Sequence, residues 1–143
     1  MRNNIVALWV LLLFIVGCTS EPDEFNFRTF LKNESSNKFT VNTYFNSEEI
    51  TSIELNNSES IDICNYISEV FGGFSGCTID SISIVFESGK GYSCDILPGT
   101  DDNLCFQDKN PFLGSENFRN IGNNDYEFVI TEEDFNNAHD LPE

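Results

Sequence analysis

The segment Phe39-Thr40-Val41-Asn42-Thr43-Tyr44-Phe45 alternates between side chains that suit a protein core and side chains that suit water. Successive residues of a β-strand point to opposite faces of a sheet, so this alternation predicts a strand with one buried and one wet face. The predicted core face carries Phe39, Val41, Thr43 and Phe45. The predicted wet face carries Thr40, Asn42, Tyr44 and Asn46.

The same period of two recurs along the chain and predicts an all-β domain. The polar stretch 33–37 is typical of a hairpin connection, and Gly89 and Gly91 supply the positive φ that a later tight hairpin needs. About seven short strands with no helix between them favour a single antiparallel β-sandwich, immunoglobulin-like or a related Greek key. The expected strands cover residues 25–31, 39–45, 50–55, 60–64, 82–86, 92–96 and 126–130.

One short helix is expected at the C-terminus, over residues 132–138. Thr131 is a good N-cap, and Asp134 stands three residues further on, in the position of a capping box. Glu132 and Glu133 suit the positive N-terminal end of a helix. The sequence therefore predicts a sandwich domain over residues 25–143 that is closed by this helix.

The first seventeen residues have the pattern of a secretory signal peptide. Arg2 precedes an apolar run over residues 5–16, which is too short to span a membrane as a helix, since that takes about 20 residues. The run ends in Ile15-Val16-Gly17-Cys18, which resembles the lipobox of bacterial lipoproteins. The resemblance implies that residues 1–17 are removed and that Cys18 is diacylated. An ordinary signal peptide with a chance cysteine and an uncleaved anchor are the alternatives.

Residues 18–24 form a short acidic tether after the expected lipid anchor. Acidic residues directly after a lipidated cysteine resemble the export signal of surface lipoproteins in Bacteroidota. The segment 126–138 also resembles the strand-then-helix C-terminus of small lipoproteins of that group. These resemblances imply a lipid-anchored protein of the outer membrane, with display on the cell surface favoured over the periplasmic face.

Four further cysteines, Cys64, Cys77, Cys94 and Cys105, are expected to form structural disulfides, because export places them in an oxidising compartment. Four cysteines allow three pairings, and sequence alone does not choose among them. The favoured pairing is Cys64–Cys77 with Cys94–Cys105, since each bond would close one of the two long loops, 65–78 and 97–124. No pair has the spacing of a zinc site, so we expect no metal and no cofactor.

Charge and composition exclude several classes of function. The formal net charge of −17 argues against nucleic-acid binding, which needs clustered Lys and Arg. The single histidine, His139, excludes a multi-histidine metal site and is expected to be an exposed terminal residue. Carboxylate pairs cannot be dismissed by counting in a chain with 24 acidic residues. A small domain whose loops are closed by disulfides nevertheless leaves little room for a substrate cleft, so we expect that the protein is not an enzyme.

The loops and one short motif hold the candidate contact residues. Phe71, Phe74, Phe106 and Phe112 lie in the two long loops and are candidates for contact with a partner; the alternative is that they pack the loops onto the core. Asp80-Ser81-Ile82 resembles the three-residue O-glycosylation signal of Bacteroidota envelope proteins, with Ser81 as acceptor. An ordinary strand start explains the same three residues.

These observations predict a monomeric, non-catalytic binding or interaction module that is attached to a membrane by its N-terminal lipid. The expected partner is a protein or a glycan. One alternative is an accessory subunit of an envelope uptake or secretion complex. Another is a small hydrolase or an inhibitor of an enzyme.

Overall fold

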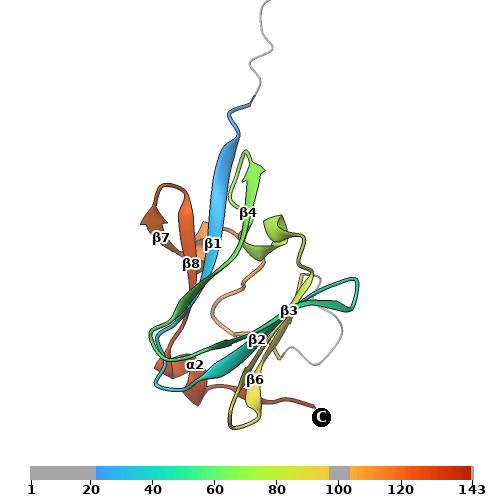
Figure 1. Cartoon of the computed structure of the whole chain (residues 1–143), viewed down its shortest axis with the longest axis vertical. Helices are drawn as coiled ribbons and strands as arrows, with labels where there is room; N and C mark the ends of the chain where they lie inside the picture. Colours follow the sequence, from blue (N-terminus) through green and yellow to red (C-terminus); the bar gives the residue numbers. More distant parts are fainter. Residues whose placement is uncertain (1–21, 97–103, 143) are drawn as a thin grey trace, which may run out of the picture.

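The computed structural model describes residues 22–96 and 104–142, and these fold into two β-sheets that face each other (Figure 1). The expected all-β sandwich with one short C-terminal helix is confirmed, with nine strands in the described residues where about seven were expected. Sheet A has the order β4 (Ser60–Ser68), β1 (Phe25–Asn33), β8 (Asp125–Ile130) and β7 (Arg119–Gly122). Sheet B has the order β3 (Glu48–Leu55), β2 (Phe39–Phe45), β5 (Ser81–Phe86), β6 (Lys90–Asp95) and β9 (His139–Asp140).

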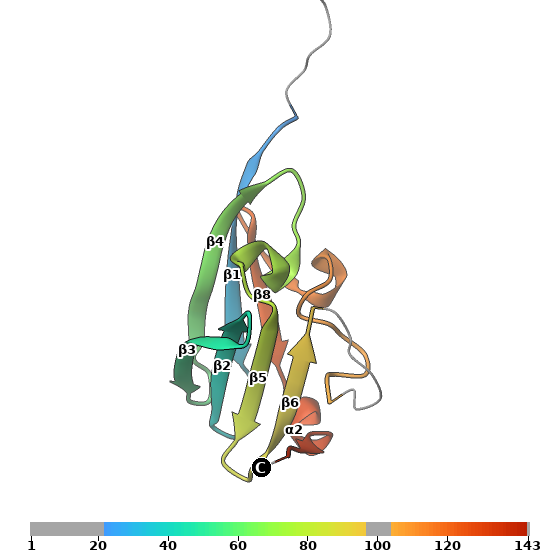
Figure 2. The ribbon, with the colours of Figure 1, turned by 90° about the vertical axis from the view of Figure 1, so that its right-hand side faces the viewer.

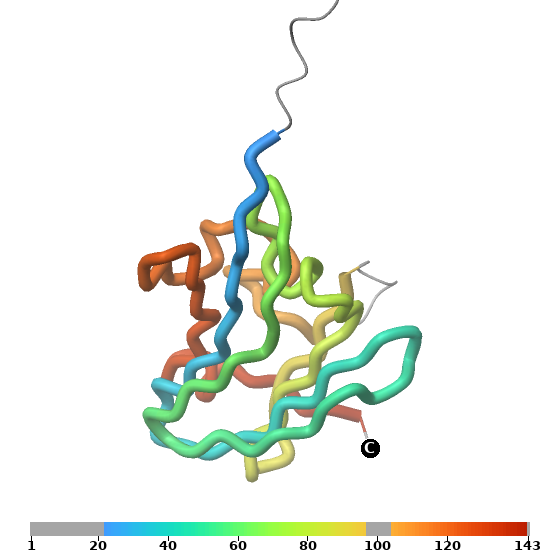
Figure 3. The backbone as a smooth tube through the Cα atoms, turned by 45° about the horizontal axis from the view of Figure 1, so that its top comes forward, coloured from blue at the N-terminus to red at the C-terminus, as the bar shows by residue number. Residues whose placement is uncertain are grey.

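One pairing departs from the expected antiparallel sandwich. β1 lies between β4 and β8 (Figure 3), and it is antiparallel to β4 but parallel to β8, with Leu31 opposite Phe128. Parallel neighbours need a long crossover connection, and here that connection runs through sheet B. Local alternation reports only that each segment is a strand, so it carries no information on the direction of a partner so distant in the sequence.

The strand boundaries differ from expectation mainly at the edges. β4 continues to Ser68, into the segment that was predicted as a loop from residue 65. β7 and β9 were not predicted, because β7 is exposed at all four positions and β9 has only two residues. Neither can show the alternation by which the longer strands were found.

The core lies between the sheets and follows the alternation closely. Along β5 the side chains of Ile82, Ile84 and Phe86 are buried, and they meet Leu31 of β1 and Phe128 of β8 in one cluster. Phe45 was placed on the core face of its strand and Phe25 begins the predicted strand 25–31, yet both are more than 40 % exposed. Each stands at the end of a strand, where the opposite sheet no longer covers it.

The C-terminal helix, α2, covers Glu132–Asn136 and is two residues shorter than expected. Its capping box is confirmed: the Asp134 N–H donates to Thr131 Oγ1 at 3.2 Å, and the Thr131 N–H donates to Asp134 Oδ2 at 2.6 Å. Ala138 is buried and the chain continues into β9. Two short 3₁₀ helices, η1 (Gly73–Cys77) and η2 (Ser115–Asn117), interrupt the long connections.

Two disulfides hold these connections with the favoured pairing. Cys64–Cys77 joins β4 to η1, with 5.7 Å between the Cα atoms. Cys94–Cys105 joins β6 to the segment that leads to η2, with 4.6 Å between the Cα atoms. Each bond therefore fixes one long connection against one sheet.

The chain enters the sandwich at one end and leaves it at the other. In Figures 1 and 2 the start of β1 is at the top, whereas the β5–β6 turn and the C-terminus are at the bottom. Within residues 22–96 and 104–142 no helix is long and apolar enough to cross a membrane. The predicted signal peptide 1–17 and Cys18 lie outside the described residues.

Candidate functional site

Three of the four phenylalanines proposed as partner contacts are buried. Phe74, Phe106 and Phe112 are 0 %, 6 % and 5 % exposed. The Phe74 ring meets Phe118 edge-on at 5.5 Å, and Phe106 stacks on Tyr92 at 3.8 Å. These side chains pack the long connections onto the core, as the alternative interpretation predicted.

Phe71 is the exception, because it is only partly buried. Its ring stacks on Tyr126 at 3.9 Å and meets Phe118 edge-on at 5.0 Å, so one side of it is held firmly. The other side lines a groove with Phe25 and Val70 at the end where the chain enters β1. Of the four predicted contact residues, Phe71 alone has part of its side chain available to a partner.

A cavity of about 490 Å³ beside α2 gathers most of the buried charge of the described part of the chain. Lys109 Nζ donates to Asp134 Oδ2 at 2.6 Å and to the Val129 carbonyl at 2.7 Å. The same Asp134 Oδ2 accepts from the N–H and the hydroxyl of Thr131. The ammonium group of Lys109 also lies 4.7 Å from the centre of the Phe106 ring. Asp134 thus caps α2 and neutralises Lys109 at once.

Tyr92 and His139 line the same cavity. The Tyr92 hydroxyl donates to the Asp134 carbonyl at 2.6 Å. Burial, together with the nearby charges of Asp134 and Asp108, raises the pKa of Tyr92 to about 12. His139 is half-buried in β9, which corrects the expectation of an exposed terminal residue; its ring meets Tyr92 edge-on, and Nε2 lies 3.3 Å from the Cys105 carbonyl oxygen.

The polar groups of this cavity connect α2, β6 and the segment after Cys105 by hydrogen bonds. Its central carboxylate oxygen already accepts three hydrogen bonds, and its lysine is held between that oxygen and a backbone carbonyl. Groups committed in this way stabilise a local structure. Across residues 22–96 and 104–142, no three His, Cys, Asp or Glu side chains stand close enough together to hold a metal ion.

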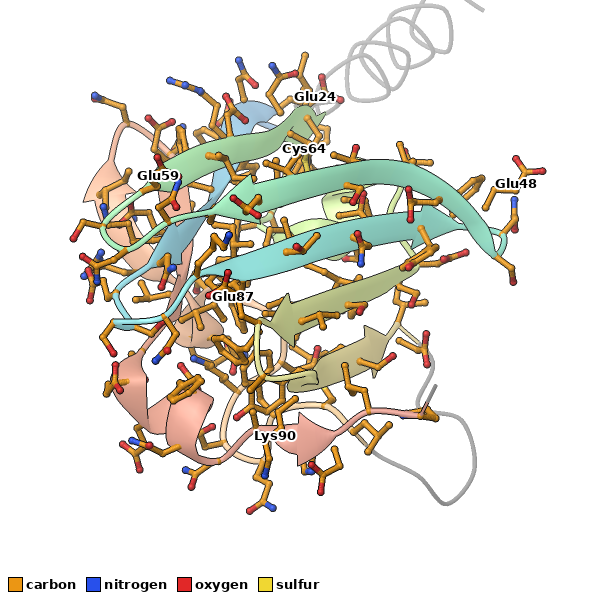
Figure 4. All side chains as sticks on the ribbon, turned by 60° about the horizontal axis from the view of Figure 1, so that its bottom comes forward. Glu24, Glu48, Glu59, Cys64, Glu87 and Lys90 are labelled. Atoms are coloured by element: carbon orange, nitrogen blue, oxygen red, sulfur yellow. A yellow bond between two sulfur atoms is a disulfide. The ribbon has the colours of Figure 1, made fainter. Side chains whose placement is uncertain are left out.

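The outer face of sheet B has a different chemistry (Figure 4). The strand register aligns Ser52, Asn42, Ser83 and Ser93 in one row across β3, β2, β5 and β6. The next row holds Glu49, Tyr44, Ser81 and Asp95. In Figure 4 this face is bounded by Glu48 at the β2–β3 hairpin and by Glu87 at the opposite end. We call these two rows the serine face.

A groove of about 750 Å³ lies on the serine face. Asp80 lines it, with Oδ2 accepting the Asn46 N–H at 2.6 Å, and Ser52 Oγ donates to Asn42 Oδ1 at 2.7 Å beside it. The hydroxyls of Ser81, Ser83 and Ser93 have no hydrogen-bond partner among the described residues. The groove is lined by Tyr44, Asn46, Ser47, Asp80, Ser81, Ser83, Ser93, Asp95 and Ile96.

Ser81 is the first residue of β5 and is partly exposed, between Tyr44 of β2 and Asp95 of β6. The strand start expected from Asp80-Ser81-Ile82 is confirmed. Glycosylation of Ser81 stays a prediction. A sugar attached there would lie in the groove.

The contact residues expected in the loops are thus mostly core residues, and the exposed hydrogen-bonding groups lie on strands. The signal for the serine face was the polar half of the alternation, Asn42 and Tyr44 in β2 and Ser83 in β5. No family model, no curated protein and no solved structure matches this chain.

Proposed function

We propose that this protein is a lipid-anchored envelope protein that binds a glycan on the serine face without catalysing a reaction. The lipobox-like Ile15-Val16-Gly17-Cys18 supports a lipid anchor at Cys18, and the acidic tether supports attachment to the outer membrane with display on the surface. The serine face supports a binding role. The protein acts as a monomer whose bound partner is held near the membrane.

The observation that carries the binding role is the set of unpartnered hydroxyls in the groove. Ser81, Ser83 and Ser93 offer groups that can both donate and accept a hydrogen bond, and sugar hydroxyls have the same double capacity. Short side chains let a sugar ring come close to the strands. The Tyr44 ring at the edge of the groove offers an apolar surface for the C–H face of a sugar.

The charges around the groove restrict the kind of glycan. Asp80 and Asp95 line it, and Glu49 stands next to Tyr44 in the same row. A phosphorylated or uronic-acid-rich chain would be repelled by these carboxylates. The proposed ligand is a neutral or amino-sugar glycan.

The direct test is a titration of the isotope-labelled protein with neutral, amino-sugar and anionic oligosaccharides, followed by NMR. We expect shifts of the amides of β2, β5 and β6 with the first two classes and none with the third. Tyr44→Ala should weaken binding at least about tenfold, whereas Arg28→Ala on sheet A should leave it unchanged. Shifts on sheet A, or no shifts with any glycan, would reject the serine face as a glycan site.

A mass measurement of the native protein separates ligand binding from modification. If Ser81 carries a glycan, the mass of wild type exceeds that of Ser81→Ala by whole sugar units, and the groove is filled by the protein's own sugar. If the two masses differ only by the oxygen atom lost in the substitution, Ser81 carries no sugar and the groove is open to an external ligand. The same spectrum tests cleavage before Cys18 and the addition of acyl chains there.

A further inference from the structure

Apolar side chains are exposed at the end of the domain where the chain enters β1. Val70 and Ile67 are 71 % and 68 % exposed, more than any other large apolar side chain in the described residues, and Leu113 and Phe25 are 55 % and 43 % exposed. We call these four residues the N-terminal pole. Phe25 pairs with Ser68 and Asn26 with Ile67, so the start of β1 lies beside the end of β4. Figures 1 and 2 place this end opposite the β5–β6 turn.

The pole is supported from below by aromatic rings. A groove of about 450 Å³ runs between Phe25, Val70 and Phe71, and its floor includes Phe27 and Tyr126. The stack of Phe71 on Tyr126 and the edge contact of Phe27 with Phe71 at 5.6 Å hold that floor in place. Phe25 and Val70 are therefore presented by a packed aromatic base.

The position of the expected anchor determines what can reach the pole. Cys18 is seven residues before Phe25, so an extended tether spans at most about 25 Å, and a flexible one averages about 15 Å. Phe25 itself belongs to the pole. A lipid at Cys18 would thus hold the pole next to the bilayer at a high effective concentration, at which even weak contacts form.

We propose that the N-terminal pole docks on the bilayer that carries the lipid anchor, with Phe25, Ile67, Val70 and Leu113 in the interfacial layer. This inference rests on the proposed anchor at Cys18. Glu24 and Glu69 directly precede Phe25 and Val70 in the sequence, Glu116 is three residues after Leu113, and Glu69 and Glu116 line the groove. The pole therefore suits a zwitterionic surface and is repelled by an anionic one. Docked in this way, the domain stands on its pole and points the β5–β6 turn away from the membrane.

Single-tryptophan variants of the acylated protein test this docking. Cleavage before Cys18 removes Trp9, the only tryptophan, so Val70→Trp at the pole and Ser88→Trp in the β5–β6 turn each carry one reporter. In vesicles of phosphatidylcholine brominated on its acyl chains, Val70→Trp should lose about two-thirds of its fluorescence and Ser88→Trp about a tenth or less. Replacing about 30 % of the lipid by phosphatidylglycerol at low salt should reduce the quenching of Val70→Trp.

Hydrogen exchange on the unsubstituted protein controls for the affinity of tryptophan itself for the interface. The amides of residues 67–71 should exchange about tenfold more slowly on vesicles than in unacylated Cys18→Ser protein mixed with the same vesicles. Quenching without this protection would show that the new tryptophan created the contact. It would overturn the proposal.

The remaining outcomes separate docking from anchoring. Intact mass reports the acyl chains: an acylated protein in which both tryptophans escape quenching keeps the proposed anchor and overturns docking. A blue-shifted but unquenched Val70→Trp would show a protein surface, such as a second copy, on the pole, and would also overturn it. A protein without acyl chains overturns both proposals.

Discussion

The outer faces of the two sheets both contact water, but they carry different polar side chains. On sheet A, Arg28 pairs with Asp62 at 3.2 Å and with Asp125 at 3.5 Å, and Arg119 pairs with Glu127 and Glu34 at 2.7 Å. The serine face of sheet B carries mostly short polar side chains, with Glu49 and Asp95 in its second row, and the hydroxyls of Ser81, Ser83 and Ser93 have no partner among the described residues. Lys38 stands at the end of the strands and pairs with Glu54 and Glu87.

The arginines of sheet A are thus paired within the molecule, whereas the hydroxyls of Ser81, Ser83 and Ser93 on the serine face have no partner among the described residues. An acidic protein with few cations has thus placed two of its three arginines on one side of the sandwich. Substitutions in the disulfides, in the buried Lys109–Asp134 pair and on each outer face test this difference between the two sheets.

The largest effect is expected from loss of the disulfides, because each fixes a connection to one of the two faces. Cys64 belongs to sheet A and Cys94 to sheet B, and each bond should contribute about 3 kcal/mol to the free energy of unfolding. We expect the Cys64→Ala/Cys77→Ala pair to keep glycan binding and the Cys94→Ala/Cys105→Ala pair to weaken it. Urea denaturation and the NMR titration measure the two properties; identical unfolding with and without reductant would contradict the first.

The Lys109–Asp134 pair provides a buried counterpart to the exposed pairs of sheet A. Asp134→Ala removes the cap of α2 and leaves Lys109 without its carboxylate, so we expect a loss of about 3 kcal/mol in the free energy of unfolding. Lys109→Met keeps the apolar stem and the cap, and should cost about 1 kcal/mol. Equal losses for the two variants would mean that the cap contributes little.

A long cationic side chain on the serine face should make that face resemble the outer face of sheet A and block ligand binding. Ser83→Lys puts a long cation between Asn42 and Ser93 and should weaken glycan binding at least about tenfold, with a change in stability within about 0.5 kcal/mol. Ser83→Ala is the matched control and should lose only a few-fold in affinity. Unchanged binding in Ser83→Lys would place the ligand elsewhere.

The ion pairs of sheet A should matter least to stability. Arg119→Ala breaks the contacts with Glu34 and Glu127. Because the Arg119 side chain is 46 % exposed and that of Glu34 40 %, although that of Glu127 is only 12 % exposed, the change should cost less than about 1 kcal/mol. Because salt screens such pairs, the difference from wild type should shrink further in about 1 M NaCl. A larger loss that persists in salt would show that this face stabilises the sandwich.

A small pH effect is expected where α2 meets the β1–β2 connection. The Ser36 N–H donates to Glu132 Oε2 at 2.7 Å, and this hydrogen bond lowers the pKa of Glu132 below its ordinary value of 4.5. A lowered carboxylate pKa stabilises the fold above the unfolded-state pKa, and the gain is lost as pH falls through the folded-state pKa. Thermal unfolding should therefore separate wild type from Glu132→Gln at pH 7 and not at about pH 3.

The sequence predicted those features that depend on nearby residues. Alternation in Phe39–Phe45 and in Ile82–Phe86 fixed the core faces, and Thr131 with Asp134 fixed the start of α2. The disulfides were predictable because each joins cysteines on either side of one connection. The parallel direction of β1 and β8 was not, since it depends on the whole path between them.

The candidate site was harder to predict than the core. Aromatic residues in Gly-rich connections suggested exposed contacts, yet Phe74 and Phe106 fill the ends of the core, where the sheets alone leave space. The serine face needs four strands in register before its hydroxyls form a surface. No single segment contains that information.

The central place of β1 in sheet A has a mechanical consequence. If a lipid at Cys18 is inserted in a bilayer, a force that pulls the domain away from the membrane acts through the tether on the first residue of β1. That strand is paired with β4 over residues 25–32 and with β8 over residues 28–33. A pull along its axis therefore loads two ladders of hydrogen bonds in shear, all together, rather than peeling an edge strand one bond at a time. A lipid at Cys18 would therefore attach the domain through a central strand of sheet A rather than through an edge strand.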